Sequence, residues 1–139
     1  MEEGLLQAKT ILETEGCTCV LWGQGAVYKS TQRGVRPLLD LLDAGLDVDG
    51  FFAADKVVGR ATAFLYCLLG IKAVYAPVMS LAALEILHSH GIAASYGCKT
   101  PAIRNRTGDG LCPMETATRN AQKPQEALEA IRMALRNLG

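Results

Sequence analysis

The stretch FFAADKVVGRATAFLYCLLG, which runs from Phe51 to Gly70, decides the fold because a short apolar segment leads directly into a longer one. The segment 50–53 has the length and apolar content of a buried strand. The residues from about Asp55 to Leu69 are long enough for a helix, and Gly70 is a typical residue at a helix C-terminus. Because a strand followed by a helix is the repeating unit of α/β proteins, this stretch predicts an α/β fold.

The segments on either side continue this alternation. Before the central stretch, the sequence predicts a helix over 2–13, a β-hairpin of strands 17–21 and 26–29, and a helix that begins near Ser30 and has Pro37 in its first turn. After it, the sequence predicts a strand over 71–75 that Pro77 ends, a helix capped by Ser80, a strand over 92–96, a short helix from Pro113 and a last helix over 125–138. We therefore expect a single three-layer α/β/α domain over residues 1–139, with a mixed five-stranded sheet.

The charge balance excludes some classes of function. The chain has 14 Lys and Arg residues and 14 Asp and Glu residues, which gives a formal net charge of zero. Without a basic excess, general nucleic-acid binding is not expected. Lys72 and Pro77 interrupt the most apolar region, 61–84, and its uncharged pieces of about a dozen residues are too short to span a bilayer. We therefore expect no membrane association.

The cysteines and the N-terminus indicate a cytosolic protein. The five cysteines are odd in number and form no CxxC pair, which favours a reducing environment. The first segment, MEEGLLQAKTILETEG, is acidic and amphipathic and lacks the features of a secretory signal peptide. With two histidines a conventional zinc centre is hard to assemble, so no metal or cofactor is expected. The leucine-rich and alanine-rich helices permit a homo-oligomer without requiring one.

The order of elements, together with AAD at 53–55 and PVMSL at 77–81, resembles the cytidine-deaminase-like fold. That fold places an H-A-E or C-A-E motif at the start of one helix and P-C-x-x-C at the start of the next. The resemblance puts Ala53, Val78 and Leu81 where zinc ligands would be, and Asp55 where the proton-shuttling glutamate would be. Because Ala, Val and Leu cannot bind zinc, a zinc-dependent deaminase is not expected.

The chain as a whole is similar to a small uncharacterised bacterial family with this fold. The stretches STQRGVRPLLDLLD, AADKVVGRA, VYAPV and NRTGDGLCPME carry the resemblance, which covers most of the chain. The family is a domain of unknown function, so the resemblance implies a fold and supplies no reaction.

Two groups of residues are candidates for a ligand site. Asp55 and Lys56 follow a strand, at the end where open α/β sheets bind ligands; the alternative is an N-cap aspartate beside a solvated lysine. The second group is a polar loop with the helix start after it, where arginines and backbone N–H groups suit a phosphate or carboxylate, unless the loop is an ordinary surface loop. Its members are Arg104, Asn105, Arg106, Thr107, Gly108, Asp109, Cys112 and Glu115.

Three functions remain open from the sequence. The first is a protein that binds a small anionic molecule, nucleotide-like or phosphorylated, on a zinc-free deaminase-like scaffold. The second is a metal-independent enzyme that uses Asp55 or Cys112 in the same pocket, since a cysteine near arginine at a helix start can react as a thiolate; the simpler interpretation of Cys112 is a small packing residue. The third is an interaction protein whose site has degenerated.

Overall fold

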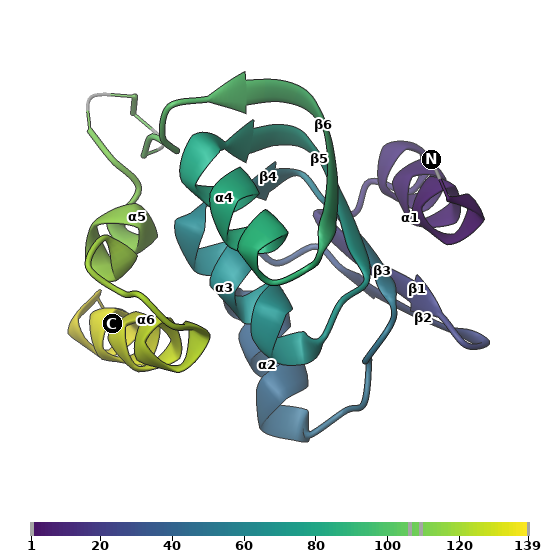
Figure 1. Ribbon diagram of the computed structural model, residues 1–139, viewed down its shortest axis with the longest axis horizontal. Helices are drawn as coiled ribbons and strands as arrows, with labels where there is room; N and C mark the ends of the chain where they lie inside the picture. The colour runs from purple at the N-terminus through teal and green to yellow at the C-terminus, as the bar shows by residue number, and fades with distance from the viewer. Residues whose placement is uncertain (1, 106, 109, 139) are drawn as a thin grey trace.

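The structure is a computed structural model that describes residues 2–105, 107, 108 and 110–138. Its elements follow the predicted alternation of helices and strands (Figure 1). In chain order they are α1 (Glu3–Thr14), β1 (Cys19–Gly23), β2 (Ala26–Ser30), α2 (Arg36–Ala44), β3 (Phe52–Asp55), β4 (Val57–Val58), α3 (Arg60–Leu69), β5 (Ala73–Ser80), α4 (Leu81–Ser89), β6 (Ala93–Thr100), α5 (Pro113–Thr118) and α6 (Pro124–Leu138). Among the described residues, no helix is both long enough and apolar enough to cross a membrane.

The elements form three layers around one sheet, which confirms the expected α/β architecture. Helix α1 lies against one face of the sheet, and α3 and α4 lie against the other (Figure 1). The amphipathic helix α1 buries Leu5, Ala8 and Leu12 against Val20 and Tyr75 of the sheet. Leu5, Ala8 and Leu12 have the spacing of one face of a helix, and Leu6, which lies off this face, is exposed.

The larger core lies between the opposite sheet face and the remaining helices. Phe64 of α3 and Val74 of β5 are fully buried in it, together with Ile131 of α6. Helices α5 and α6 pack against α3 on the side away from the sheet (Figure 1). An ion pair of 2.8 Å between Arg132 and Asp43 joins α6 to α2. The C-terminal helices thereby form an outer layer on α3.

The sheet is mixed, as predicted, but the described residues form six strands in it and not five. Its order is β2-β1-β3-β5-β4, and β6 pairs with β5. Strand β1 is antiparallel to β2 and β3, whereas β5 is parallel to β3, β4 and β6. The additional strand is β4, whose two residues are too few to show the alternation of apolar and polar positions that predicts a strand. The pairs Ala54↔Tyr75 and Val57↔Val78 have the same offset, so β3 and β4 are one strand interrupted near Lys56.

The start of α3 corrects the prediction for the central stretch. The helix begins at Arg60 and not at Asp55, because the chain stays extended through Val58 and Gly59 is the N-cap. Asp55 is therefore the last residue of β3, and its interpretation as a helix cap is wrong. Two consecutive β-branched valines favour extended backbone, which is the physical reason for the later helix start.

Pro77 does not end its strand, contrary to the prediction. Strand β5 continues to Ser80, and its pairing with β6 passes from Ala76↔Tyr96 to Val78↔Cys98 without a pair at Pro77. A proline lacks the backbone N–H, so the ladder loses one rung there while the strand continues. Ser80 does cap α4 as predicted, since its hydroxyl accepts a hydrogen bond of 3.1 Å from the Ala83 N–H.

Candidate functional site

A cavity of about 730 Å³ lies where the β3–β4 strand leads into α3. The loop before α2, residues 103–105, residues 112–115 and Leu135 of α6 also line it. Six of the ten predicted site residues line it: Asp55, Lys56, Arg104, Asn105, Cys112 and Glu115. The strand end and the polar loop, which are about fifty residues apart in the sequence, therefore share one cavity. Arg106 and Asp109 lie outside the described residues.

Four cationic side chains line the cavity. Lys56 and Arg104 were predicted, whereas Arg33 and Arg36 come from the loop before α2 and the first residue of that helix. All four residues are exposed. Within the part of the chain that the structure describes, the ion pairs are Lys29–Glu15, Lys72–Glu2 and Arg132–Asp43, so none of the four has an ion-pair partner there. Among the described residues, the positive charge that these four side chains bring to the cavity is therefore not neutralised by ion pairs.

The walls between these cations are largely apolar. They come from the loop before α2, from the β4–α3 connection, from the start of α5 and from α6. The apolar lining residues are Val35, Val57, Ala61, Ile103, Pro113, Met114 and Leu135. A cavity of this size with a few polar groups among apolar walls has the composition of small-molecule sites in general.

Asp55 is one of two buried acidic residues that line this cavity. Its residue is 7 % exposed, and its Oδ2 accepts a hydrogen bond of 2.8 Å from the Tyr66 hydroxyl of α3. Burial raises the pKa of the Asp55 carboxyl to about 7, because the charged form loses water, although hydrogen bonds from Tyr66 and from the backbone at Val57 oppose this rise. The carboxyl therefore changes its charge near neutral pH.

A hydrogen-bonded chain continues from Asp55 into the core. The sheet register places Cys19 of β1 opposite Asp55, and the Cys19 Sγ lies 3.4 Å from the Tyr66 hydroxyl. Burial is the main cause that raises the pKa of the Cys19 thiol and of the Tyr66 phenol well above their usual values, and the nearby Asp55 charge adds to both shifts. Both groups are therefore neutral at neutral pH. Cys19 is 3 % exposed, and the sequence pattern does not indicate that it or Tyr66 lies beside the site.

Glu115 has a structural contact within the cavity. It is 8 % exposed, and its Oε1 accepts a hydrogen bond of 2.9 Å from the backbone N–H of Arg60, at the start of α3. A carboxylate is favourable there because the helix N-terminus carries unsatisfied N–H groups and a positive partial charge. Gly59 permits this contact, since a Cβ at that position would overlap the Glu115 carboxylate.

Described residues of the polar loop are joined to one another by hydrogen bonds. Arg104 and Leu111 form an antiparallel bridge, and the Asn105 Oδ1 accepts hydrogen bonds from the Thr107 hydroxyl at 3.2 Å and from the Gly108 N–H at 2.9 Å. Thr107 and Gly108 do not line the cavity. Their predicted role as direct ligand contacts is therefore not supported by their position, whereas Asn105 shapes the loop and lines the cavity.

Cys112 is half-buried and precedes α5. It lines the cavity, and its backbone N–H donates to the Ile103 carbonyl at 2.9 Å. Neither histidine of the chain lines this cavity. A role for Cys112 as a nucleophile stays a prediction.

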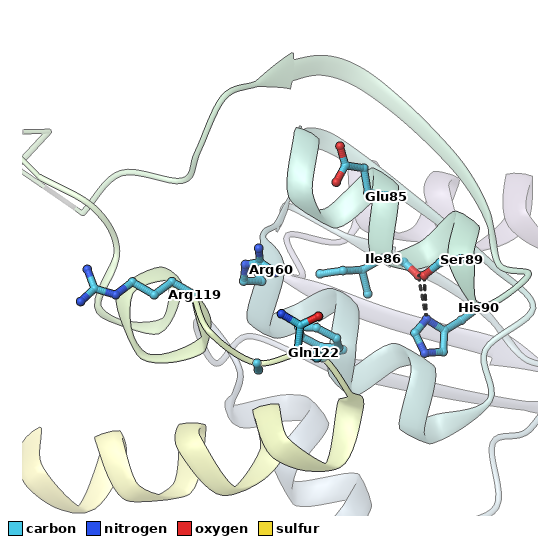
Figure 2. Close-up of a pocket in the computed structure, with 9 residues that line it drawn as sticks. Arg60, Glu85, Ile86, Ser89, His90, Arg119 and Gln122 are labelled. Carbon is cyan, nitrogen blue, oxygen red and sulfur yellow. Dashed lines mark hydrogen bonds between the residues drawn. The ribbon is translucent and has the colours of Figure 1, made fainter.

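A smaller cavity of about 300 Å³ lies on another side of the α3 N-terminus (Figure 2). Arg60, Glu85, His90 and Arg119 contribute its charged and titratable groups. Figure 2 shows the Arg119 side chain directed away from Arg60 and His90, so these groups do not converge on one point. The His90 Nδ1 is already hydrogen-bonded to the Ser89 hydroxyl at 3.1 Å and to the Ile86 carbonyl at 2.9 Å.

The described residues contain no group of three or more His, Cys, Asp or Glu side chains that could hold a metal ion. AAD at 53–55 lies in β3 and not at the start of a helix, where an H-A-E or C-A-E motif would stand. PVMSL at 77–81 does lead into a helix, since α4 begins at Leu81. The residues at the two observed helix starts, 59–62 and 80–83, include no histidine or cysteine.

Comparison with known proteins places the chain in a family. Residues 7–135 match the family model described as TM1506, a domain of unknown function (DUF1893), so the chain belongs to the DUF1893 family. The solved structure of a DUF1893 family protein, TM1506 from Thermotoga maritima, is similar with a TM-score of 0.84 and 27 % sequence identity, over 99 % of this chain and 92 % of that one. This confirms the expected resemblance to an uncharacterised family.

The likeness to deaminases is present but weak. A diaminohydroxyphosphoribosylaminopyrimidine deaminase/5-amino-6-(5-phosphoribosylamino)uracil reductase from Thermotoga maritima aligns with a TM-score of 0.44 and 15 % identity. The alignment covers 68 % of this chain and 35 % of that one. A search of curated proteins finds no match.

Proposed function

We propose that this protein binds a small organic anion in the cavity of about 730 Å³ between β3, α2, α5 and α6. The observation that carries the proposal is the convergence of Arg33, Arg36, Lys56 and Arg104 on one cavity, without ion-pair partners among the described residues. Arginines bind carboxylates and phosphates with paired hydrogen bonds. An anion would therefore supply the counter-charge that the described part of the chain does not.

The charge balance of the lining favours an anion even when its acids are counted. Against four cations stand two carboxyl groups, Asp55 and Glu115. Glu115 already interacts with the α3 N-terminus, and the pKa of Asp55, about 7, leaves it only partly ionised at neutral pH. The lining is therefore net positive near pH 7.

The size and the apolar walls narrow the class of ligand. Small-molecule sites span roughly 300 to 1,000 Å³, so this cavity can hold more than an inorganic ion. An apolar or planar body would contact Val57, Ile103 and Met114, while an acidic group would reach the arginines. A phosphorylated or nucleotide-like molecule has both parts.

The test is a thermal-shift screen with nucleotides, sugar phosphates and aromatic carboxylates, with affinities then measured by calorimetry. Arg36→Ala and Arg104→Ala should each weaken the binding of a hit by about tenfold or more, since each removes a charge-assisted contact of roughly 1.5–3 kcal/mol. Arg136→Ala is the matched control, because Arg136 is an exposed arginine of α6 outside the cavity. Equal weakening in the control and the cavity variants would contradict the proposal.

A second candidate function is a metal-independent enzyme that uses the same cavity. The observation that favours it is the placement of Asp55, whose pKa of about 7 suits an acid or base at neutral pH, beside cations that stabilise negative charge. A ligand that the protein converts, with conversion lost in Asp55→Asn while binding persists, would support it. If no anion of the screen binds, an interaction protein becomes the better interpretation.

A further inference from the structure

The position of Asp55 has a consequence for any ligand of the cavity. Asp55 lines the same cavity as the four cationic residues, and it is 7 % exposed. Its side-chain hydrogen bond within the chain joins it to Tyr66, which is neutral. Among the described ion pairs none includes Asp55. Hydrogen bonds from Tyr66 and from the backbone at Val57 and Lys56 therefore stabilise the ionised carboxylate only in part, since burial outweighs them.

A ligand would make the surroundings of this carboxyl still less favourable for a negative charge. An apolar body packed between Val57, Ile103 and Met114 would exclude water from the cavity, and an acidic group at the arginines would add a second negative charge to it. Desolvation and like charge both disfavour an ionised carboxyl. Both effects therefore act in the same direction and favour the protonated form of Asp55.

We propose that the cavity binds amphipathic organic anions, with an apolar body and an acidic group, together with a proton that Asp55 takes up. The inference rests on the proposed function and adds to it a ligand class and a regulation by pH. Binding then strengthens as the pH falls through neutrality, because a larger fraction of the free protein already carries the proton.

The other charged and titratable groups around Asp55 do not reproduce this behaviour. Cys19 of β1 and Tyr66 of α3 have pKa values raised far above neutrality, so both stay neutral when Asp55 titrates. The arginines and Lys56 supply the positive charges of the lining. Among the described residues, Glu115 of α5 and Cys112 are the remaining acidic and thiol groups of the lining, and Glu115 accepts a hydrogen bond from the Arg60 N–H at the α3 N-terminus. Neither histidine lines the cavity.

The test uses benzenesulfonate and 2-naphthalenesulfonate, whose own charge is constant near neutral pH. Calorimetry at pH 6 and pH 8 should show about tenfold weaker binding at the higher pH, because with a pKa of about 7 the protonated fraction of the free carboxyl falls by about that factor. At pH 7, titrations in two buffers with different ionisation enthalpies should show an uptake of about half a proton per bound sulfonate.

Two variants separate this effect from a general loss of structure. Asp55→Asn should bind the sulfonates with the same affinity at both pH values, since the titrating group is gone. Tyr66→Phe removes a hydrogen bond that stabilises the ionised carboxyl, so the midpoint of the pH dependence should move upward. A merely structural role of Tyr66 would change affinity without moving the midpoint.

The outcomes are distinct for the two proposals. Sulfonate affinity that is equal at both pH values in the unmodified protein overturns the inference and leaves anion binding intact. Failure of the sulfonates to bind, while a phosphorylated compound of the screen does, overturns the amphipathic class alone. Failure of every anion overturns both proposals.

Discussion

At Asp55, burial and hydrogen bonding act on the carboxyl in opposite directions. Loss of water raises its pKa, and the Tyr66 hydroxyl lowers it by stabilising the charge. Burial prevails, so the pKa of about 7 exceeds the 3.8 of an exposed aspartate. The folded protein consequently holds a proton on Asp55 over a range of pH in which the unfolded chain has released it.

This difference predicts how stability depends on pH. The contribution of Asp55 is fully present below about pH 4 and is lost as the pH rises through about 7, a change of at most ~4 kcal/mol in the free energy of unfolding. Urea denaturation from pH 5 to pH 8 should therefore show a declining stability that is flatter in Asp55→Asn. Asp40→Asn, at an exposed position of α2, is the control. Parallel slopes in all three proteins would contradict the raised pKa.

Gly59 and Glu115 form the second residue-level prediction. In Gly59→Ala the new Cβ would overlap the Glu115 carboxylate and would lie 2.8 Å from the Ile103 Cγ1. Overpacking of this kind costs about 1–3 kcal/mol, measured as a loss of unfolding free energy. The double variant Gly59→Ala/Glu115→Ala should cost less than the sum of its two single variants, because the overlapping carboxylate is gone. Strictly additive costs would show that the two positions do not touch.

At the level of the elements, Ser80 provides a test of a cap that the sequence itself predicts. The buried Ser80 hydroxyl accepts a hydrogen bond from the Ala83 N–H and so satisfies one free donor at the start of α4. Ser80→Ala should lower the free energy of unfolding by about 1–2 kcal/mol. Ser95→Ala in β6 is the comparison and should change stability by a few tenths of a kcal/mol at most. Equal effects would mean that the cap contributes nothing.

Most elements follow from local chemistry, and the exceptions have identifiable causes. Gly45 and Gly70 end α2 and α3 with positive φ angles of 67° and 73°, as the glycine pattern predicts. The length of the segment and the polar pair at 55–56 suggest a helix start at Asp55. The two valines that follow prefer extended backbone, and this preference delays the observed helix start to Arg60. The local sequence suggests that Pro77 ends the strand. The strand continues because the residues on both sides of Pro77 pair with β6, and this partner strand cannot be identified from the local sequence.

At the scale of the whole molecule, the cavity joins four segments that are distant in the sequence. The strand end at Asp55 and the polar loop could be predicted, because both carry charged residues at places where α/β folds bind ligands. Arg36 and Tyr66 could not be assigned to the site, because only the tertiary arrangement brings the start of α2 and the middle of α3 to Asp55. Two arginines close to a glycine, at positions 33, 34 and 36, are the sequence feature that indicates a ligand contact from the loop before α2.

The most direct test of anion binding in this cavity is a ¹H–¹⁵N correlation spectrum of the labelled protein, titrated with the strongest anionic hit. The account predicts that the largest shifts fall on backbone amides of the lining, including Arg36, Lys56, Arg104 and Cys112. Shifts centred on His90 and Arg119 would instead assign the ligand to the smaller cavity. That result, or shifts spread evenly over the surface, would contradict the central claim.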